Sequence, residues 1–315
     1  MTLLVVVIVA SVLGAAALLV LLISALSARL MISPPRQPLW TTPGEVGMAY
    51  EDVTFRALDG VRLSGWHIPA AQSTAGSAPT VVMVHGWPWN RLGALSTGPL
   101  KNLPGSRPVN LMPVMEALHR EGFNVLAYDL RNHGKSGASR PMTAGWREAY
   151  DILGALDYLS SRGDVDTQRI GLLGFSLGGN TVLYALPWTR GIKAAVAVQP
   201  LTSSVFGQRF GRERLGPLYT LVGPLFELFY RLAGGPSTKF IDPVVVARRA
   251  GETAVLYVQG KGDKWGSVEN VADMVAATPN AVEPIYPDTE ERYGGYHYLI
   301  DNPQVVTSFF GRYLK

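Results

Sequence analysis

The sequence predicts an α/β fold with a largely parallel sheet, preceded by a transmembrane helix. The chain of 315 residues has a positive mean hydropathy of +0.14, which is high for a soluble enzyme. Most of the excess comes from one uncharged apolar run near the N-terminus. After that run, short apolar strands alternate with helical segments, and this alternation is typical of crossover units that build a parallel sheet.

The apolar run extends from Leu3 to Ala28 without a charged residue. As a helix it would be about 39 Å long, enough to cross a hydrocarbon core of about 30 Å. A cleavable secretory signal is disfavoured, because nothing basic precedes the run, its apolar core is about twice too long, and Ala25-Leu26-Ser27 is a weak cleavage site. We expect residues 1–30 to form an uncleaved anchor; the alternative is a buried core helix.

The residues after the anchor indicate its orientation and a linker. Arg29 and Arg36 follow the apolar run and no basic side chain precedes it, so the positive-inside rule favours a cytoplasmic body on a single-pass anchor. Residues 31–48 are expected to form an extended spacer, because prolines remove backbone donors and stiffen the chain. These prolines are Pro34, Pro35, Pro38 and Pro43.

The body is expected to span residues 49–315 as one α/β domain with an eight-stranded sheet and helices on both faces. A hairpin turning at Asp59-Gly60 supplies two antiparallel edge strands. The other strands are short apolar runs, typical of strands buried on both faces. The expected strands are 49–57, 61–68, 80–84, 124–128, 170–175, 194–198, 254–258 and 282–285, and the expected helices are 111–121, 144–162, 177–186, 268–277 and 303–313.

Two long segments, 87–109 and 201–249, interrupt this alternation, and loops of such length are usually functional. We expect residues 201–249 to be a helical lid insertion. Its segment Leu215–Leu232 is apolar, and it would either line an acyl pocket or contact the bilayer. A helical insertion that simply packs on the core is the equal alternative.

Composition excludes several functional classes. The chain has no cysteine, which excludes disulfide scaffolds, thiolate zinc sites, iron–sulfur clusters and cysteine nucleophiles. Only 17% of the residues are charged, the net charge is +4, and no basic block indicates a nucleic-acid partner. We expect neither a metal nor a cofactor, and the sequence indicates no oligomeric state.

The motif that carries chemistry is Gly174-Phe175-Ser176-Leu177-Gly178, a G-x-S-x-G. It follows an apolar strand and opens a helix, which is the setting of a nucleophile elbow. Gly174 and Gly178 are expected to be required by the tight turn. Ser176 is the candidate nucleophile; the alternative is a serine that only caps a helix.

A serine hydroxyl needs a base, and the base needs an orienting acid, in the chain order serine, acid, histidine. Of five histidines only His297 follows Ser176, and we expect it in a loop before the last helix. Asp263 is the expected acid, because it follows a strand at the carboxyl edge of the sheet. The alternatives are a surface histidine, an Asp263 that only caps the next helix, and the rival acids Asp242, Asp288, Glu290 and Glu291.

The tetrahedral intermediate needs two N–H donors for its oxyanion. The expected donors are the backbone N–H groups of Leu177, after the nucleophile, and of Trp87, in the loop after the third strand. Trp87 is preferred because Pro88 has no N–H. His85 is expected to shape this loop or to be a satisfied buried histidine.

Together these motifs resemble the α/β-hydrolase superfamily, and in particular its serine-aminopeptidase/monoacylglycerol-lipase-like branch with membrane-anchored bacterial members. The resemblance covers residues 50–315 and implies structural roles for Asp129 and Arg131. Asn132, where the branch often has glycine, and the long 87–109 loop depart from the pattern. The motifs are His85-Gly86-Trp87, the run from Tyr128 to Ser136, the serine elbow, Gly260-Lys261-Gly262-Asp263 and His297.

The sequence therefore predicts a membrane-anchored serine hydrolase that cleaves esters or thioesters through an acyl-enzyme. Its expected substrate is a small-molecule or lipid-like acyl compound, and its other expected partner is the membrane. The competing functions are a peptidase on the same triad and a non-catalytic membrane scaffold.

Overall fold

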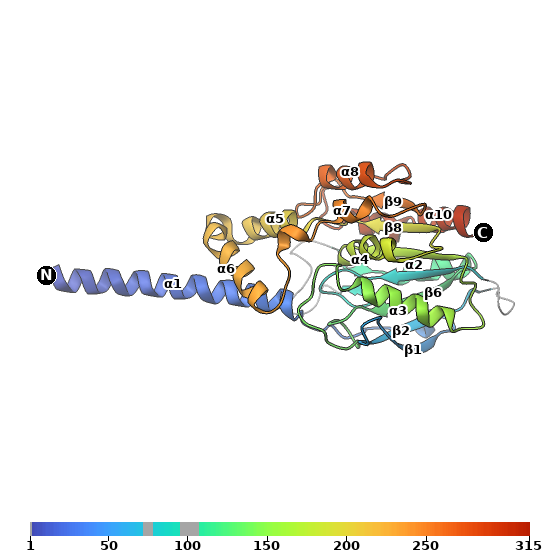
Figure 1. The fold of residues 1–315 in the computed structure, drawn as a ribbon, viewed down its shortest axis with the longest axis horizontal. Coiled ribbons are helices and arrows are strands. Elements are labelled where there is room, and N and C mark those ends of the chain that lie inside the picture. The colour runs from blue at the N-terminus through green and yellow to red at the C-terminus, as the bar shows by residue number, and fades with distance from the viewer. Residues whose placement is uncertain (1, 72–77, 95–106) are drawn as a thin grey trace.

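The computed structural model describes residues 2–71, 78–94 and 107–315 (Figure 1). Helices cover both faces of a central sheet, and a long N-terminal helix, α1 (Thr2–Ile32), projects from the body. This is the α/β architecture that the alternation of apolar strands and helices predicts.

The main sheet has seven strands in the order β1-β2-β6-β3-β7-β8-β9. β2 runs antiparallel to both β1 and β6, and the strands from β6 to β9 are parallel. Every residue of the five parallel strands is buried, which explains their continuous apolar runs. The strands are β1 (Glu51–Arg56), β2 (Arg62–Ile68), β3 (Thr80–Val84), β6 (Asn124–Asp129), β7 (Ile170–Phe175), β8 (Ala194–Val198) and β9 (Ala254–Val258).

Successive residues of each central strand point to opposite faces, so Leu172 enters one core and Leu173 the other. Seven helices cover these two cores. The first face carries α3 (Ala149–Ser160), α4 (Leu177–Ala185), α7 (Pro243–Ala247) and α8 (Val268–Ala277), and the second carries α2 (Met112–Arg120), α9 (Gly294–Asp301) and α10 (Gln304–Leu314).

Three local expectations are wrong. In place of the eighth strand, 282–285, there are two isolated bridges at Ala281 and Ile285, because Pro284 between them has no N–H for a continuous ladder. The helix expected from residue 144 begins at Ala149, since Gly145 has a left-handed φ of 114°. His297 lies in helix α9 and not in a loop.

The long segments that interrupt the alternation are structured where the structure describes them. A small antiparallel pair, β4 (Gly93–Ala94) and β5 (Val109–Asn110), flanks residues 95–106, which lie outside the described residues. Residues 201–249 form a helical insertion; its function as a lid remains a prediction. The insertion contains α5 (Ser203–Leu215), α6 (Tyr219–Leu232), α7 and two short 3-10 turns, Gly216–Leu218 and Thr238–Phe240.

Length and composition allow α1 to cross a membrane, although a signal sequence meets the same criterion. Its C-terminal part packs against α6, and the linker that follows lies on the body. Arg36 donates to the carbonyl oxygen of Gly134 at 2.8 Å, and Asn90 donates to that of Pro38 at 2.8 Å. The proline-rich segment is therefore hydrogen-bonded to the body.

Candidate active site

Ser176 lies at the sharp turn between β7 and α4, at the carboxyl edge of the parallel strands. Its backbone has φ 53° and ψ −112°, a strained conformation for a residue with a side chain. The turn is held by the Ser176 N–H, which donates to the carbonyl oxygen of Val198 at 2.8 Å. Strain of this kind is characteristic of the nucleophile elbow, where it exposes the hydroxyl above the sheet.

The two elbow glycines are fixed by close backbone contacts. A Cβ on Gly174 would lie 2.2 Å from the carbonyl oxygen of Gly178, and a Cβ on Gly178 would lie 2.1 Å from that of Val84. Both distances are far below a van der Waals contact, so neither position accepts a side chain without a backbone shift.

The segments that carry the expected oxyanion donors lie against each other. The Leu177 N–H is the first of helix α4, and the first N–H groups of a helix have no partner within it. A Cβ on Gly86 would come within 3.3 Å of the Phe175 carbonyl oxygen, so the loop after β3 passes beside the elbow. Trp87, half-buried, follows in that loop. Its oxyanion role, like that of Leu177, stays a prediction.

His85 joins the loops that follow β3 and β6. Its Nδ1 lies 2.7 Å from the Gly86 carbonyl oxygen, and its Nε2 accepts from the Leu130 N–H at 3.0 Å. Burial lowers the pKa of His85 to about 4, so the ring is neutral at pH 7. Both ring nitrogens are engaged in shaping the loop.

Two buried ion-pair clusters hold the loop after β6. Asp129 pairs with Arg91 at 2.8 Å; burial alone would raise the pKa of Asp129, but Arg91 lowers it below its usual value. Arg131 pairs with Asp59 at 2.6 Å and with Asp151 at 2.7 Å. These contacts are the structural roles that the family resemblance implies for Asp129 and Arg131.

Asp263 follows β9 at the same edge of the sheet, but its carboxylate contacts groups other than His297. Oδ1 lies 2.9 Å from Nη1 of Arg292 and accepts from the Trp265 N–H at 2.9 Å. Oδ2 accepts from Gln199 at 2.7 Å and from Gln259 at 3.2 Å. Burial by itself would lower the pKa of Arg292, but the neighbouring Asp263 carboxylate raises the pKa above its usual value.

Gln199 is a site residue that the sequence reasoning missed. It follows β8, is completely buried and has a left-handed φ of 46°. Its Nε2 donates to Asp263 and, at 3.1 Å, to the Arg292 carbonyl oxygen, while its Oε1 accepts from the Gly295 N–H at 2.7 Å. It thereby joins the Asp263 loop to the start of α9. The only signal in the sequence is a polar residue directly after a buried strand.

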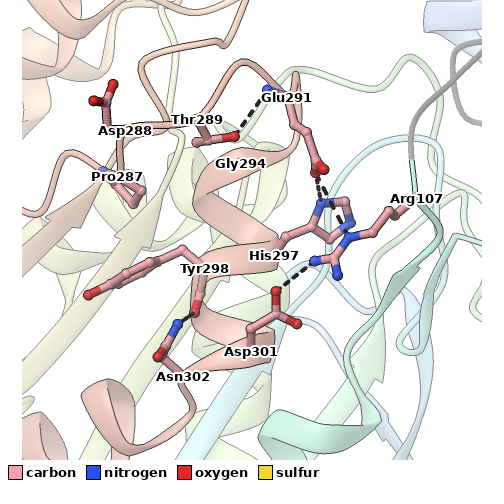
Figure 2. A pocket seen from close by; sticks show the side chains of 10 residues that line it. All are labelled: Arg107, Pro287, Asp288, Thr289, Glu291, Gly294, His297, Tyr298, Asp301 and Asn302. Carbon is pink, nitrogen blue, oxygen red and sulfur yellow. Dashed lines mark hydrogen bonds and ion pairs between the residues drawn. The ribbon is translucent and has the colours of Figure 1, made fainter.

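His297 points from α9 toward Glu291, as Figure 2 shows. Its Nδ1 lies 2.5 Å from Glu291 Oε2, and its Nε2 lies 3.3 Å from the Pro108 carbonyl oxygen. Both ring nitrogens are therefore engaged away from Ser176 and Asp263. The structure brings the three expected triad residues to one edge of the sheet but does not join them by hydrogen bonds.

Tyr296, which precedes His297 in α9, lies close enough to Ser176 for the serine to affect its pKa. Its hydroxyl group is buried and makes no hydrogen bond of good geometry. Burial raises the pKa of Tyr296 to about 12, and Arg292 and Ser176 oppose that rise. A neutral phenol therefore stands next to the candidate nucleophile at pH 7.

A pocket of about 470 Å³ opens beside His297 (Figure 2). Its charges are mixed, since Arg107 pairs with Asp301 at 2.7 Å and approaches Glu291 at 4.0 Å. The lining residues are Arg107, Pro287, Asp288, Thr289, Glu291, Gly294, His297, Tyr298, Asp301 and Asn302.

A group with metal-ligand spacing among the described residues lies at a different place. Ligand atoms of Glu51, His67 and Asp164 lie within 4.8 Å of one another, on and beside the edge strands β1 and β2. Arg162 pairs with Glu51 at 2.8 Å and with Asp164 at 2.5 Å. The guanidinium already neutralises the carboxylates that would hold a cation, so we assign no metal there.

Comparison with known proteins identifies relatives for most of the body. Residues 81–315 match the Alpha/beta hydrolase family. The uncharacterized protein YfhR of Salmonella typhimurium is 34% identical over 154 residues, covering 49% of this chain and 44% of YfhR. The thiohydrolase aneE of Aspergillus aculeatus is 25% identical over 158 residues, covering 50% of this chain and 43% of aneE. The chain thus spans less than half the length of these two relatives.

A solved structure is similar over nearly the whole chain. The esterase Pf2001 of Pyrococcus furiosus has a TM-score of 0.68 and 27% identity, and the match covers 90% of this chain and 99% of the esterase. The narrower branch suggested by the motifs stays a prediction. Because the family match runs from β3 to the C-terminal helix and includes the elbow, the chain belongs to the alpha/beta hydrolase family.

Proposed function

We propose that this protein is a serine hydrolase that cleaves carboxylic esters or thioesters through an acyl-enzyme. The observation that carries the proposal is Ser176 in a strained turn between a buried strand and a helix, with close backbone packing at Gly174 and Gly178. The strained backbone at Ser176 lowers the stability of the fold, and a serine that only capped a helix would not need this strain.

In the proposed reaction Ser176 Oγ attacks the acyl carbon while His297 accepts the hydroxyl proton. His297 then gives this proton to the leaving group. The N–H groups of Leu177 and Trp87 would stabilise the oxyanion. To do this, Nε2 of His297 must leave the Pro108 carbonyl oxygen. Nδ1 must also leave Glu291 if Asp263 is the acid that orients the ring. We expect this rearrangement to accompany substrate binding, because catalytic hydrogen bonds often reach their final geometry only in the complex.

Two carboxylates are candidates for orienting His297. Asp263 is the first, because it follows β9 at the carboxyl edge and Gln199 ties its loop to the start of α9. Glu291 is the second, because it lies 2.5 Å from Nδ1 of His297. We expect Asp263→Asn to lower kcat by about 10⁴ and Glu291→Gln to leave it close to native. A large loss of kcat in Glu291→Gln and a small one in Asp263→Asn would identify Glu291 as the orienting acid.

An apolar acyl group is the proposed substrate class. The insertion that follows β8 carries the aromatic rings of Phe206 and Phe210, which pack on Trp265 beside Asp263. Two similar proteins are named as an esterase and a thiohydrolase, which supports ester or thioester chemistry. A peptidase that binds a substrate amine is less favoured, because the insertion has seven basic and only three acidic residues.

We also propose that α1 is a single-pass anchor with the body on the cytoplasmic side, supported by Arg29 after the apolar run. A cysteine introduced on the body, for example Leu58→Cys, should then be blocked by a membrane-impermeant maleimide only after the cells are opened. Blocking in intact cells would place the body outside.

Fluorophosphonate labelling tests the nucleophile. The full-length protein in detergent should be labelled, and Ser176→Ala should not. Ser160→Ala, on the exposed surface of α3, is the matched control and should be labelled as the native chain is. If the native chain is not labelled, or if Ser176→Ala is labelled equally, the proposal of a serine hydrolase with Ser176 as its nucleophile is wrong. Turnover of acyl esters, thioesters and aminoacyl amides then separates esterase, thioesterase and peptidase.

A further inference from the structure

We propose that helix α6 lies in the membrane interface beside α1 and inserts a stripe of exposed leucines among the lipids of an anionic bilayer. This goes beyond the proposed chemistry and rests only on α1 crossing the membrane. Figure 1 shows α5 and α6 beyond the body, along the side from which α1 emerges.

The first observation is that α1 and α6 are packed together. Ser24 and Ala28, one turn apart on α1, are completely buried, and Ser24 Oγ lies 3.4 Å from the Val222 carbonyl oxygen of α6. Val222 itself is 2% exposed. Small side chains let two helices approach closely, so α6 is held at a fixed level along α1.

The second observation is where that level lies. On α1 every described residue from Thr2 to Leu19 is exposed, and Val20 is the first that is partly covered. At ~1.5 Å per residue the uncovered part measures about 27 Å, close to the ~30 Å hydrocarbon core. If this part spans the core, α6 meets α1 just where the hydrocarbon ends and the headgroups begin.

The third observation is an apolar face of α6 that the protein leaves uncovered. Leu221, Leu228 and Leu232 are 58%, 49% and 75% exposed, and together with Leu225 they follow helical spacing along one face. Val222 and Tyr230, which point elsewhere, are buried. A helix with one face on protein and a second apolar face uncovered is suited to lie in the interface plane.

The positive charge of the insertion favours an anionic bilayer. Residues 201–249 contain seven basic and three acidic side chains, so their net charge of +4 equals that of the entire chain. Exposed Arg231 adjoins Leu232, and exposed Lys239 adjoins Phe240, which is 84% exposed. Basic groups beside apolar ones match anionic headgroups above acyl chains.

The chain has no cysteine, so single-cysteine variants can be labelled at one position with an environment-sensitive fluorophore. Leu228→Cys probes the stripe, Leu58→Cys is the matched control because Leu58 is 65% exposed on the body, and Val12→Cys reports whether α1 spans. Each full-length protein is reconstituted into phosphatidylcholine vesicles with and without phosphatidylglycerol. Lipids with a spin label near the headgroup end or near the tail end of the acyl chain serve as quenchers.

We expect the label at position 228 to be quenched by the headgroup-end spin label, more strongly with phosphatidylglycerol, and the label at position 58 to be unaffected. The label at position 12 should be quenched by the tail-end spin label. Quenching at 12 without quenching at 228 would overturn the proposal while leaving the anchor intact. No quenching at 12 would overturn both, and neither outcome depends on hydrolase activity.

Discussion

Asp263→Asn should destabilise the body because Asp263 compensates a buried cation. The Asp263 carboxylate and Arg292 lie 2.9 Å apart, and their side chains are 0% and 6% exposed. Removing one partner of a buried ion pair costs about 3–5 kcal/mol, because the other charge remains in a poor solvent. The faces of Trp265 and Tyr293, 4.5 and 5.0 Å from the guanidinium carbon, retain part of the stabilisation. We therefore expect a loss of about 3 kcal/mol, at the lower end of this range.

Thermal unfolding of the full-length protein in detergent, followed by tryptophan fluorescence, measures this loss. A change of about 3 kcal/mol corresponds to a fall in Tm of about 6–12 °C in a domain of this size. Glu291→Gln is the matched control. It neutralises a carboxylate that is 44% exposed, and it should change the free energy of unfolding by less than about 1 kcal/mol. Equal Tm values for Asp263→Asn and Glu291→Gln would refute the reasoning, because they would show that Arg292 does not depend on Asp263.

Two further predictions concern stability, and a third concerns the turn that holds Ser176. The folded state lowers the pKa of His85 from 6.5 to about 4, so the unfolded chain binds the proton more readily. The free energy of unfolding should therefore fall by up to about 3 kcal/mol as the pH drops from 6.5 to 4. Denaturant titrations of His85→Gln should show a shallower pH dependence than those of the native chain. Gly178→Ala, whose Cβ would overlap the Val84 carbonyl group, should abolish fluorophosphonate labelling. Gly179→Ala, whose Cβ would lie 3.3 Å from the nearest atom, should retain most of the labelling. Equal labelling of the two variants would contradict the proposed elbow geometry. Gly311→Ala on α10 meets no atom within 4 Å and should stabilise the protein by up to about 1 kcal/mol, which a lower Tm would contradict.

The sheet and the strand–turn–helix around Ser176 could be predicted because each depends on a local pattern. Strands such as 80–84 and 194–198 are buried on both faces, so their apolar runs are continuous in the sequence. Ser176 is recognisable because the strand, the two glycines and the helix are adjacent in the chain. The expected strand 282–285 also has a local pattern, but Pro284 in its middle limited it to isolated bridges.

The partners of the ionisable groups could not be read in the same way. Arg292 looks like a surface residue in the sequence, and only the packing of α9 against the loops after β8 and β9 buries it beside Asp263. Gln199 bridges segments that are 64 and 96 residues away, so no local pattern indicates its contacts. The contact between His297 and Glu291 depends on α9 being a helix, which the two glycines at its start made hard to expect.

The sequence by itself determined a long apolar N-terminal helix, an alternating α/β body and a serine at a strand–turn–helix junction, because hydrophobic period and turn chemistry depend on neighbouring residues. The tertiary structure alone decided which carboxylate contacts His297, which cation contacts Asp263, and that α6 packs on α1. Those outcomes depend on how elements far apart in the chain share buried volume, and burial sets the strength of every charge contact there.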